Sequence, residues 1–229
     1  LHFSIRQLFK CHKKMLQSFQ KSKPTSDPRL PITPQILQSL LNALEHTTSS
    51  LFTKSLLRAM FTLAFCAFLR IGEITKTSSP IQHFLLFGNV SISSDEQHNN
   101  FIEIKIPHFK HAKSTTATLR LYQNKTNSLV CPYLSLLSYL KVRKHISQSA
   151  PLFSFMDGSA ISKHYFTQQL RLVLSFCNFD LTRYQTRIFR IDAATTAAAC
   201  GFSELQIQTM GRWQSTAFKK YIRIPTLQV

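Results

Sequence analysis

Acidic residues are scarce in this sequence. Only 10 Asp and Glu stand against 28 Lys and Arg among its 229 residues, which leaves a formal net charge of +18 at pH 7. So large an excess of one sign opposes compaction and favours a polyanionic partner. Nucleic acid and an anionic membrane surface are the two candidates, because both concentrate phosphates whose counterions are released on binding.

A long apolar run is also missing. The longest apolar stretch, residues 56–69, is interrupted by Arg58 and Thr62, and it is shorter than the roughly 20 residues that span a bilayer. The first residues lack the pattern of a secretory signal peptide. We therefore predict nucleic acid, and no membrane, as the partner.

The cysteines lack the spacing of a metal site. Neither a Cys-x-x-Cys pair nor a zinc-ligand spacing with histidine occurs. Their scattered, mostly apolar surroundings predict reduced, buried thiols in an intracellular protein. The five are Cys11, Cys66, Cys131, Cys177 and Cys200. A glycine-rich phosphate loop is absent too, so neither a metal nor a nucleotide cofactor is predicted.

Apolar periodicity predicts a mainly helical chain. Thr33 and Pro34 have the pattern of a helix start, with an apolar stripe up to Leu44. A nearly all-apolar helix over residues 54–69 should be central in the core. Later helices are predicted at residues 132–146 and 162–177, after Arg190 up to Gly201, and from the capping residues Ser203 and Ser215.

Strand-like alternation is confined to the middle of the chain. Residues 101–106 alternate between isoleucines and charged side chains, and residues 117–122 alternate as well. A basic loop over residues 108–113 joins them, which predicts a hairpin, and an earlier short strand is expected within residues 84–92. The fold class is therefore mainly α with a small antiparallel β-sheet (α+β).

Basic residues recur at the ends of the predicted elements. A solvated surface charge is the ordinary interpretation of any one of them. In a chain of charge +18, phosphate contact is the better interpretation of the group. In the closing section they are Arg183, Arg187, Arg190, Arg212, Lys219, Lys220 and Arg223.

Arg70 differs from these residues because it follows fourteen mostly apolar ones. It should emerge from the core, where burial without a partner is costly. Glu73, one turn further on, could orient it in a purely structural pair. Alternatively, the arginine is held rigidly to clamp a phosphate bidentately. The spacing alone leaves both interpretations open.

Several segments resemble motifs of the tyrosine recombinases, the phage-integrase-like family, in that family's order. AFLRIGEI (residues 67–74) resembles the first arginine box, and RIFRIDAATTAAACG (187–201) resembles the second. MGRW (210–213), followed by Tyr221, resembles the final box and the nucleophile. The GRW form, the AATTAAA run and the PLF…DG segment (151–158) resemble the eukaryotic branch of DIRS-like and Crypton mobile elements.

The resemblance implies a metal-independent cleavage of DNA. Tyr221 would attack a DNA phosphate, leaving a 3′-phosphotyrosyl bond and a free 5′-hydroxyl, so that the covalent bond conserves the phosphodiester energy. Arg70 and Arg190 would stabilise the negative charge of the transition state. A lysine in the hairpin loop would give the leaving 5′-oxygen its proton: Lys110 by its distance to the second strand, or alternatively Lys113.

The resemblance also implies further contacts to DNA. The indole N–H of Trp213 or the side chain of Arg212 would contact the scissile phosphate. Without the family motifs, Trp213 is an ordinary core aromatic and Tyr221 a half-buried helix aromatic. Further DNA contacts are predicted at Lys113, His111, Lys219, Lys220, Arg223 and Arg183.

Two residues depart from the family pattern. Arg187 stands where the second box usually begins with histidine. Histidine exchanges a proton near neutral pH, whereas arginine stays charged and cannot act as a base. Asp192 stands where relatives of this branch often carry glycine, and an acid there would weaken the positive field. Both departures predict weakened activity.

The resemblance divides the chain in two. Residues 1–28 are predicted to be the remnant of an N-terminal helical DNA-binding domain with its linker, and residues 29–229 the catalytic domain. The implied partner is double-stranded DNA, bound by a tetramer, in the nucleus. The chain is then a recombinase or a DNA-binding module derived from one. A third possibility, a basic helical RNA or chromatin adaptor, leaves the ordered motifs unexplained.

Overall fold

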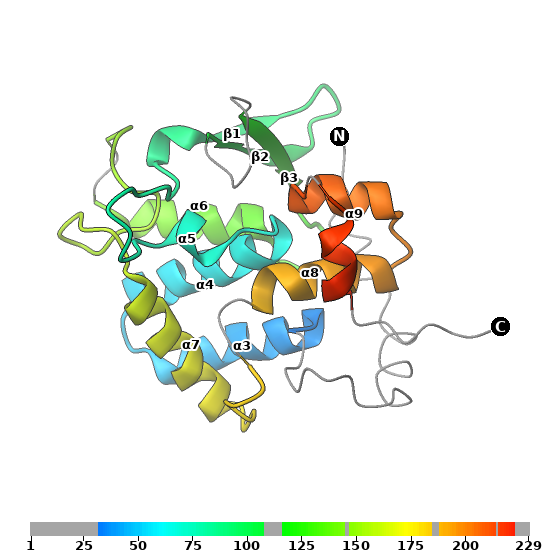
Figure 1. Cartoon of the computed structure of the whole chain (residues 1–229). Helices are drawn as coiled ribbons and strands as arrows, with labels where there is room; N and C mark the ends of the chain where they lie inside the picture. The colour runs from blue at the N-terminus through cyan, green and yellow to red at the C-terminus, as the bar shows by residue number, and fades with distance from the viewer. Residues whose placement is uncertain (1–31, 108–115, 145–146, 185–187, 214, 223–229) are drawn as a thin grey trace.

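The computed structural model describes residues 32–107, 116–144, 147–184, 188–213 and 215–222 (Figure 1). The unit predicted for residues 1–28 and the basic loop predicted for residues 108–113 lie outside this part of the chain. The helices are α3 (Pro34–Thr47), α4 (Leu51–Cys66), α5 (Ile71–Ile74), α6 (Pro132–Val142), α7 (Lys163–Phe176), α8 (Ile188–Ala199) and α9 (Glu204–Gly211). Two 3-10 helices, η1 (Phe87–Asn89) and η2 (Thr216–Tyr221), and three strands, β1 (Val90–Ser94), β2 (Asn100–Ile106) and β3 (Ala117–Tyr122), complete these elements.

Helix α4 is the centre of the core and packs against α3, α6 and α8. It begins and ends three residues earlier than predicted. Ser50 starts it, because its hydroxyl accepts a hydrogen bond from the Thr53 N–H. It ends at Cys66, and Phe68 then takes a left-handed backbone with φ of 52°. The predicted cap at Thr33 is confirmed, since its hydroxyl accepts from the Ile36 N–H at 3.3 Å.

The sheet has the order β1-β2-β3, with both neighbouring pairs antiparallel. The predicted pairing of the two alternating segments is confirmed, and Ile102, Ile104 and Ile106 are buried on one face. The earlier strand begins later than residue 84, because η1 occupies part of the expected range before Val90. Figure 1 shows the sheet above α6, α4 and α3.

The last third of the described chain folds over α4. Helix α8 begins at Ile188, so Arg190 lies in its first turn rather than before it. The small side chains Ala193, Ala194 and Ala197 are fully buried, which allows α8 to approach α4 closely. The predicted capping box of α9 is confirmed by its two reciprocal hydrogen bonds. The final predicted helix is the 3-10 helix η2, which packs on α8.

The fold class is confirmed: the described chain is mostly helical with one three-stranded antiparallel sheet. Within it, no helix is long and apolar enough to cross a bilayer.

Candidate active site

The candidate site begins where α4 ends. After Ala67 the chain turns through Phe68 and Leu69, and Arg70 precedes the four-residue helix α5. The Glu73 carboxylate accepts two hydrogen bonds from Arg70, one from its backbone N–H at 2.8 Å and one from Nη1 at 3.0 Å. The structural pairing considered for Arg70 and Glu73 is therefore present.

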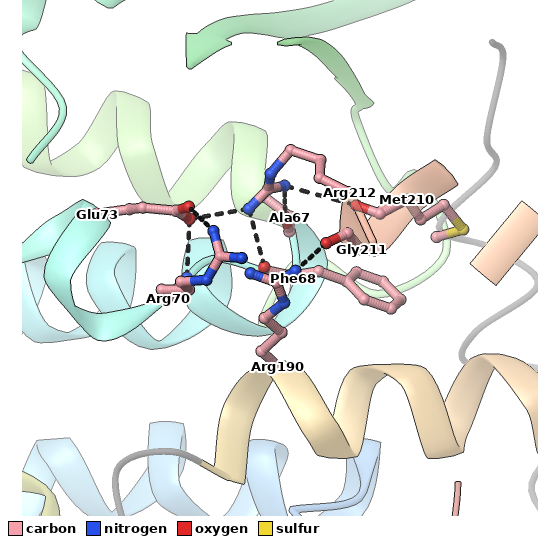
Figure 2. Close-up of polar contacts among 8 residues, drawn as sticks. All are labelled: Ala67, Phe68, Arg70, Glu73, Arg190, Met210, Gly211 and Arg212. Atoms are coloured by element: carbon pink, nitrogen blue, oxygen red, sulfur yellow. Dashed lines mark hydrogen bonds and ion pairs between the residues drawn. The ribbon is translucent and has the colours of Figure 1, made fainter. Parts of the chain in front are cut away.

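Glu73 also binds a second arginine from a distant part of the chain. Arg212 Nη2 donates to Glu73 Oε2 at 2.8 Å and to the Phe68 carbonyl at 3.1 Å, and Nη1 donates to the Ala67 carbonyl at 3.1 Å (Figure 2). Only 4% of Glu73 and 7% of Arg212 are exposed. One carboxylate thus joins two arginines, the partly exposed Arg70 and the buried Arg212.

Burial acts on the charge of Arg212. Desolvation lowers the pKa of its guanidinium from the ordinary value; the Glu73 charge opposes this, and the nearby Arg70 charge lowers the pKa further. An arginine nevertheless stays protonated in proteins. A buried cation beside a second cation creates a positive potential that a further anion would relieve.

Arg190 enters the same cluster from α8. Its Nη2 donates a hydrogen bond to the Gly211 carbonyl, and its guanidinium carbon lies 4.5 Å from the centre of the Trp213 ring. This is a cation–π contact. Figure 2 shows the side chains of Arg70, Arg190 and Arg212 pointing toward one another. Arg190 is thereby held between the backbone of one motif residue and the ring of another.

The Gly-Arg-Trp segment has a backbone that suits this arrangement. A Cβ added at Gly211 would lie only 1.5 Å from the Trp213 ring, so no larger residue fits at this point without a shift. Arg212 has φ of 55°, a left-handed conformation that turns the chain at the end of α9. The glycine makes room for the ring, and the turn directs Arg212 toward α4.

Aromatic contacts tie η2 to the cluster. Trp213 packs edge-on to Phe68, with ring centres 6.4 Å apart, and it lies 5.7 Å from the ring of the fully buried Phe218. Phe218 belongs to η2, whose last residue is Tyr221. The segment that ends at Tyr221 is therefore anchored to the same aromatic group that covers Arg190.

The cluster has an excess of positive charge. Three guanidinium groups and one carboxylate carry 3 − 1 = +2 formal charges. Arg70 is the most exposed of these, with 33% of its side chain accessible. Within the described part of the chain, its guanidinium makes no hydrogen bond other than the one to Glu73. The arrangement is suited to bind an anion and to stabilise negative charge on it.

The structure brings together four predicted site residues: Arg70, Arg190, Arg212 and Trp213. Tyr221 and Lys220 are described only by their backbone in η2. Lys219 forms an exposed ion pair with Glu204 at 2.7 Å, and Arg183 is exposed in the turn that follows Asp180. Five other predicted residues lie outside the described chain: Lys110, His111, Lys113, Arg187 and Arg223.

Two parts of the site were missed by sequence reasoning. One is the second partner of Glu73, Arg212, and the other is the pair of backbone carbonyls at Ala67 and Phe68 that Arg212 binds. The one available signal was the presence of an acid inside an arginine motif of a chain with so few acids. Among the described residues, no group of His, Cys, Asp and Glu is placed to hold a metal ion.

Solved structures with a similar backbone include recombinases and an integrase in complex with DNA. The XerH site-specific recombinase bound to its palindromic difH substrate has a TM-score of 0.59 at 13% identity, over 84% of this chain and 48% of that chain. The Flpe–Holliday junction complex has a TM-score of 0.56 at 17% identity, over 93% of this chain and 50% of that chain. The Tn1549 transposon integrase with circular intermediate DNA has a TM-score of 0.54 at 15% identity, over 90% of this chain and 64% of that chain.

The chain has the fold of a tyrosine recombinase catalytic domain. It spans about half the length of the XerH and Flpe chains that it matches. No protein family model and no curated protein matches the sequence.

Proposed function

We propose that this chain breaks and rejoins DNA strands as a tyrosine recombinase or integrase. The observation that carries the proposal is that Arg70 and Arg212 share the Glu73 carboxylate, while Arg190 points toward them from α8, beside the anchored η2 segment. A cluster with two excess positive charges suits a phosphodiester, whose transition state gains negative charge on its non-bridging oxygens. The fold shared with recombinase–DNA complexes and the net charge of +18 support the same substrate.

The proposed reaction exchanges one phosphoester bond for another. The Tyr221 hydroxyl releases its proton to solvent and its oxygen bonds to phosphorus, while the bond from phosphorus to the 5′-oxygen breaks, which leaves a 3′-phosphotyrosyl link. Arg70 and Arg190 stabilise the phosphate charge. The leaving 5′-oxygen takes its proton from Lys110, or alternatively from Lys113. Trp213 holds Arg190 through its ring face, and its indole N–H is a further candidate for phosphate contact.

The wider assignments rest on the sequence motifs. The GRW form and the AATTAAA run support an origin in eukaryotic mobile elements of the DIRS-like or Crypton kind, with the nucleus as the place of action. Residues 29–229 would be the catalytic domain, residues 1–28 the remnant of a DNA-binding domain, and a tetramer the working assembly on DNA. Outer DNA contacts would come from His111, Lys113, Arg183, Lys219, Lys220 and Arg223.

A second candidate function is supported by Arg187. An arginine at that position retains attraction for phosphate but gives no proton exchange near neutral pH. The chain would then be a DNA-binding module derived from a recombinase, which holds DNA without cutting it.

A nicked suicide duplex tests the proposal. We expect the chain to form a covalent adduct with the DNA, visible as a shifted band on a denaturing gel, and we expect Tyr221→Phe to abolish it. Salt-sensitive DNA binding without any adduct would support the module instead. The absence of both would refute both functions.

Arg187→His tests the explanation of weakened activity. If the missing histidine limits the reaction, this variant should form the adduct faster than the unaltered chain, because a proton-exchanging group is restored. Arg187→Lys is the matched control, since it changes the side chain but restores no group that titrates near pH 7. An equal adduct rate in all three proteins would remove Arg187 as the cause.

A further inference from the structure

We propose that Arg212 is a positioning residue that orients Arg70 through Glu73, and that it does not itself contact the scissile phosphate. The inference rests on the proposed function and adds a role that differs from the phosphate contact expected from the motif. It concerns the geometry of the phosphate-binding arginine rather than the chemistry of the nucleophile.

The hydrogen bonds of Arg212 lead into the protein. Nη1 donates to the carbonyl of Ala67 at 3.1 Å, and Nη2 donates to the carbonyl of Phe68 at 3.1 Å and to Glu73 at 2.8 Å. Only 3% of the side chain is exposed. To bind a phosphate, the two terminal nitrogens would have to give up these buried acceptors and leave them unpaired. The remaining donor, Nε, is itself buried.

Glu73 passes this constraint on to Arg70. Its Oε2 accepts from both Arg212 Nη2 and the Arg70 backbone N–H, while Oε1 accepts from Arg70 Nη1 (Figure 2). The buried Arg212 thus fixes the carboxylate, and the carboxylate in turn fixes the partly exposed Arg70. Because Glu73 contacts Arg70 at both its backbone N–H and its guanidinium, it sets the orientation of the side chain as well as its distance.

The position of Arg212 also explains why one residue joins two distant motifs. The Ala67 and Phe68 carbonyls belong to the turn that ends α4, and Arg212 follows α9. Its neighbour Trp213 covers Arg190, and its neighbour Gly211 accepts a hydrogen bond from Arg190. Arg212 therefore fixes the turn that bears Arg70 relative to the segment that holds Arg190.

A double-mutant cycle of Arg212→Lys and Arg70→Ala tests the inference. Lysine keeps the charge but cannot span the four acceptors of Arg212, which are Glu73 and the carbonyls of Ala67, Phe68 and Met210. We expect Arg212→Lys to slow adduct formation at saturating DNA by about 10- to 100-fold, because a small misplacement of a catalytic group has effects of that size. In the Arg70→Ala background it should slow the reaction by less than about threefold, since the residue through which it acts is gone.

The same cycle is repeated on binding, with Tyr221→Phe in every protein so that no cleavage occurs. We expect Arg70→Ala to weaken DNA binding by about tenfold when Arg212 is intact, as for the loss of a charged hydrogen bond, and clearly less when Arg212 is lysine. If the unaltered chain makes no adduct, the proposed function fails, while this binding cycle still decides whether Arg212 acts through Arg70.

Arg143→Lys is the matched control. Arg143 is equally buried and donates to the carbonyls of Leu152 and Pro151, but it has no contact with Glu73 or Arg70. It should leave the adduct rate at saturating DNA within about twofold of that of the unaltered chain.

Three results would overturn the inference: independent, multiplicative effects of Arg70 and Arg212 in both cycles, no effect of Arg212→Lys, or an equal slowing by Arg143→Lys. If Arg212→Lys does not fold, Arg212→Gly replaces it in both cycles, because glycine suits the backbone with φ of 55°. The same non-additivity is then expected of it.

Discussion

Two buried arginines of this molecule do different work. Arg143 and Arg212 are each more than nine-tenths buried, and both donate to backbone carbonyls, Arg143 to two and Arg212 to three. Among the described residues, Arg143 otherwise meets the ring faces of Phe87, at 5.3 Å, and Tyr139, at 5.8 Å. Arg212 instead meets the Glu73 carboxylate, which also holds Arg70.

The difference lies in the charge of the partners. Burial lowers the pKa of both guanidinium groups, but only Arg212 has a carboxylate beside it that opposes the shift. Neutral carbonyls and rings make Arg143 a joint between α6 and the segment after it. The shared carboxylate makes Arg212 part of an electrostatic unit. Buried arginines are therefore better classified by the charges around them than by the number of hydrogen bonds they donate.

Removal of the shared charge should have the largest effect. Glu73→Gln leaves two arginines, one of them buried, without their counter-charge, and we expect a loss of about 3–5 kcal/mol in the free energy of unfolding. Urea denaturation measures it. The control is Glu103→Gln, which removes the charge from a much more exposed pair with Arg120 and should cost about 1 kcal/mol or less. Equal losses in the two variants would show that the carboxylate at residue 73 is not special.

The next effect concerns the glycine beside Arg212. In Gly211→Ala the new Cβ meets the Trp213 ring at 1.5 Å, and we expect overpacking to cost about 3 kcal/mol. The displaced ring should also weaken its contact with Arg190, so DNA affinity should fall with stability. Gly201→Asn is the control, because residue 201 has a left-handed backbone with φ of 79° but open space around it, and asparagine tolerates that conformation. If Gly201→Asn is equally damaging, the loss in Gly211→Ala is not specific to crowding against the Trp213 ring.

A smaller effect is expected at the neutral joint. Arg143→Lys leaves at least one buried carbonyl with a poorer donor, and we expect a loss of roughly 1–2 kcal/mol in the free energy of unfolding. DNA affinity, measured by titration at fixed salt, should stay unchanged because the charge is kept and the hydrogen-bond and ring partners of Arg143 lie outside the cluster. If DNA affinity falls as much in Arg143→Lys as in Gly211→Ala, Arg143 and Arg212 do not differ in their effect on DNA binding.

The smallest effect is expected on the surface. Lys219→Gln removes the exposed ion pair with Glu204 and should change stability by about 1 kcal/mol or less. If Lys219 also contacts a phosphate, DNA affinity should weaken across all sequences and the salt dependence should fall by about one unit of slope. An unchanged salt slope would leave Lys219 as a surface partner of Glu204 only.

Local patterns predicted the parts of this fold that local forces determine. The caps at Thr33 and Ser203 and the alternation of isoleucines in β2 appear where the sequence places them. The predicted boundaries of α4 were wrong at both ends. Ser50 was overlooked as a cap, and Phe68 takes a left-handed conformation that is unusual for a phenylalanine.

Local patterns could predict one of the two ion pairs of the site and not the other. Arg70 and Glu73 are three residues apart, so their pairing could be considered from helical spacing. Glu73 and Arg212 are 139 residues apart, and no periodicity connects them. The family motifs placed Arg212 at the site but gave no direction to its side chain, which depends on the turn at the end of α9 and on the carbonyls it meets.

The contact of Arg190 with Trp213 has a practical consequence. Trp213 is the only tryptophan in the sequence, so the tryptophan fluorescence of this protein comes from a ring that lies 4.5 Å from a site arginine and next to the buried Phe218. Any event that moves the guanidinium or lifts η2 changes the surroundings of this one fluorophore. The protein thus carries its own optical probe at the place where DNA is proposed to bind, and no label is needed to follow it in a stopped-flow experiment.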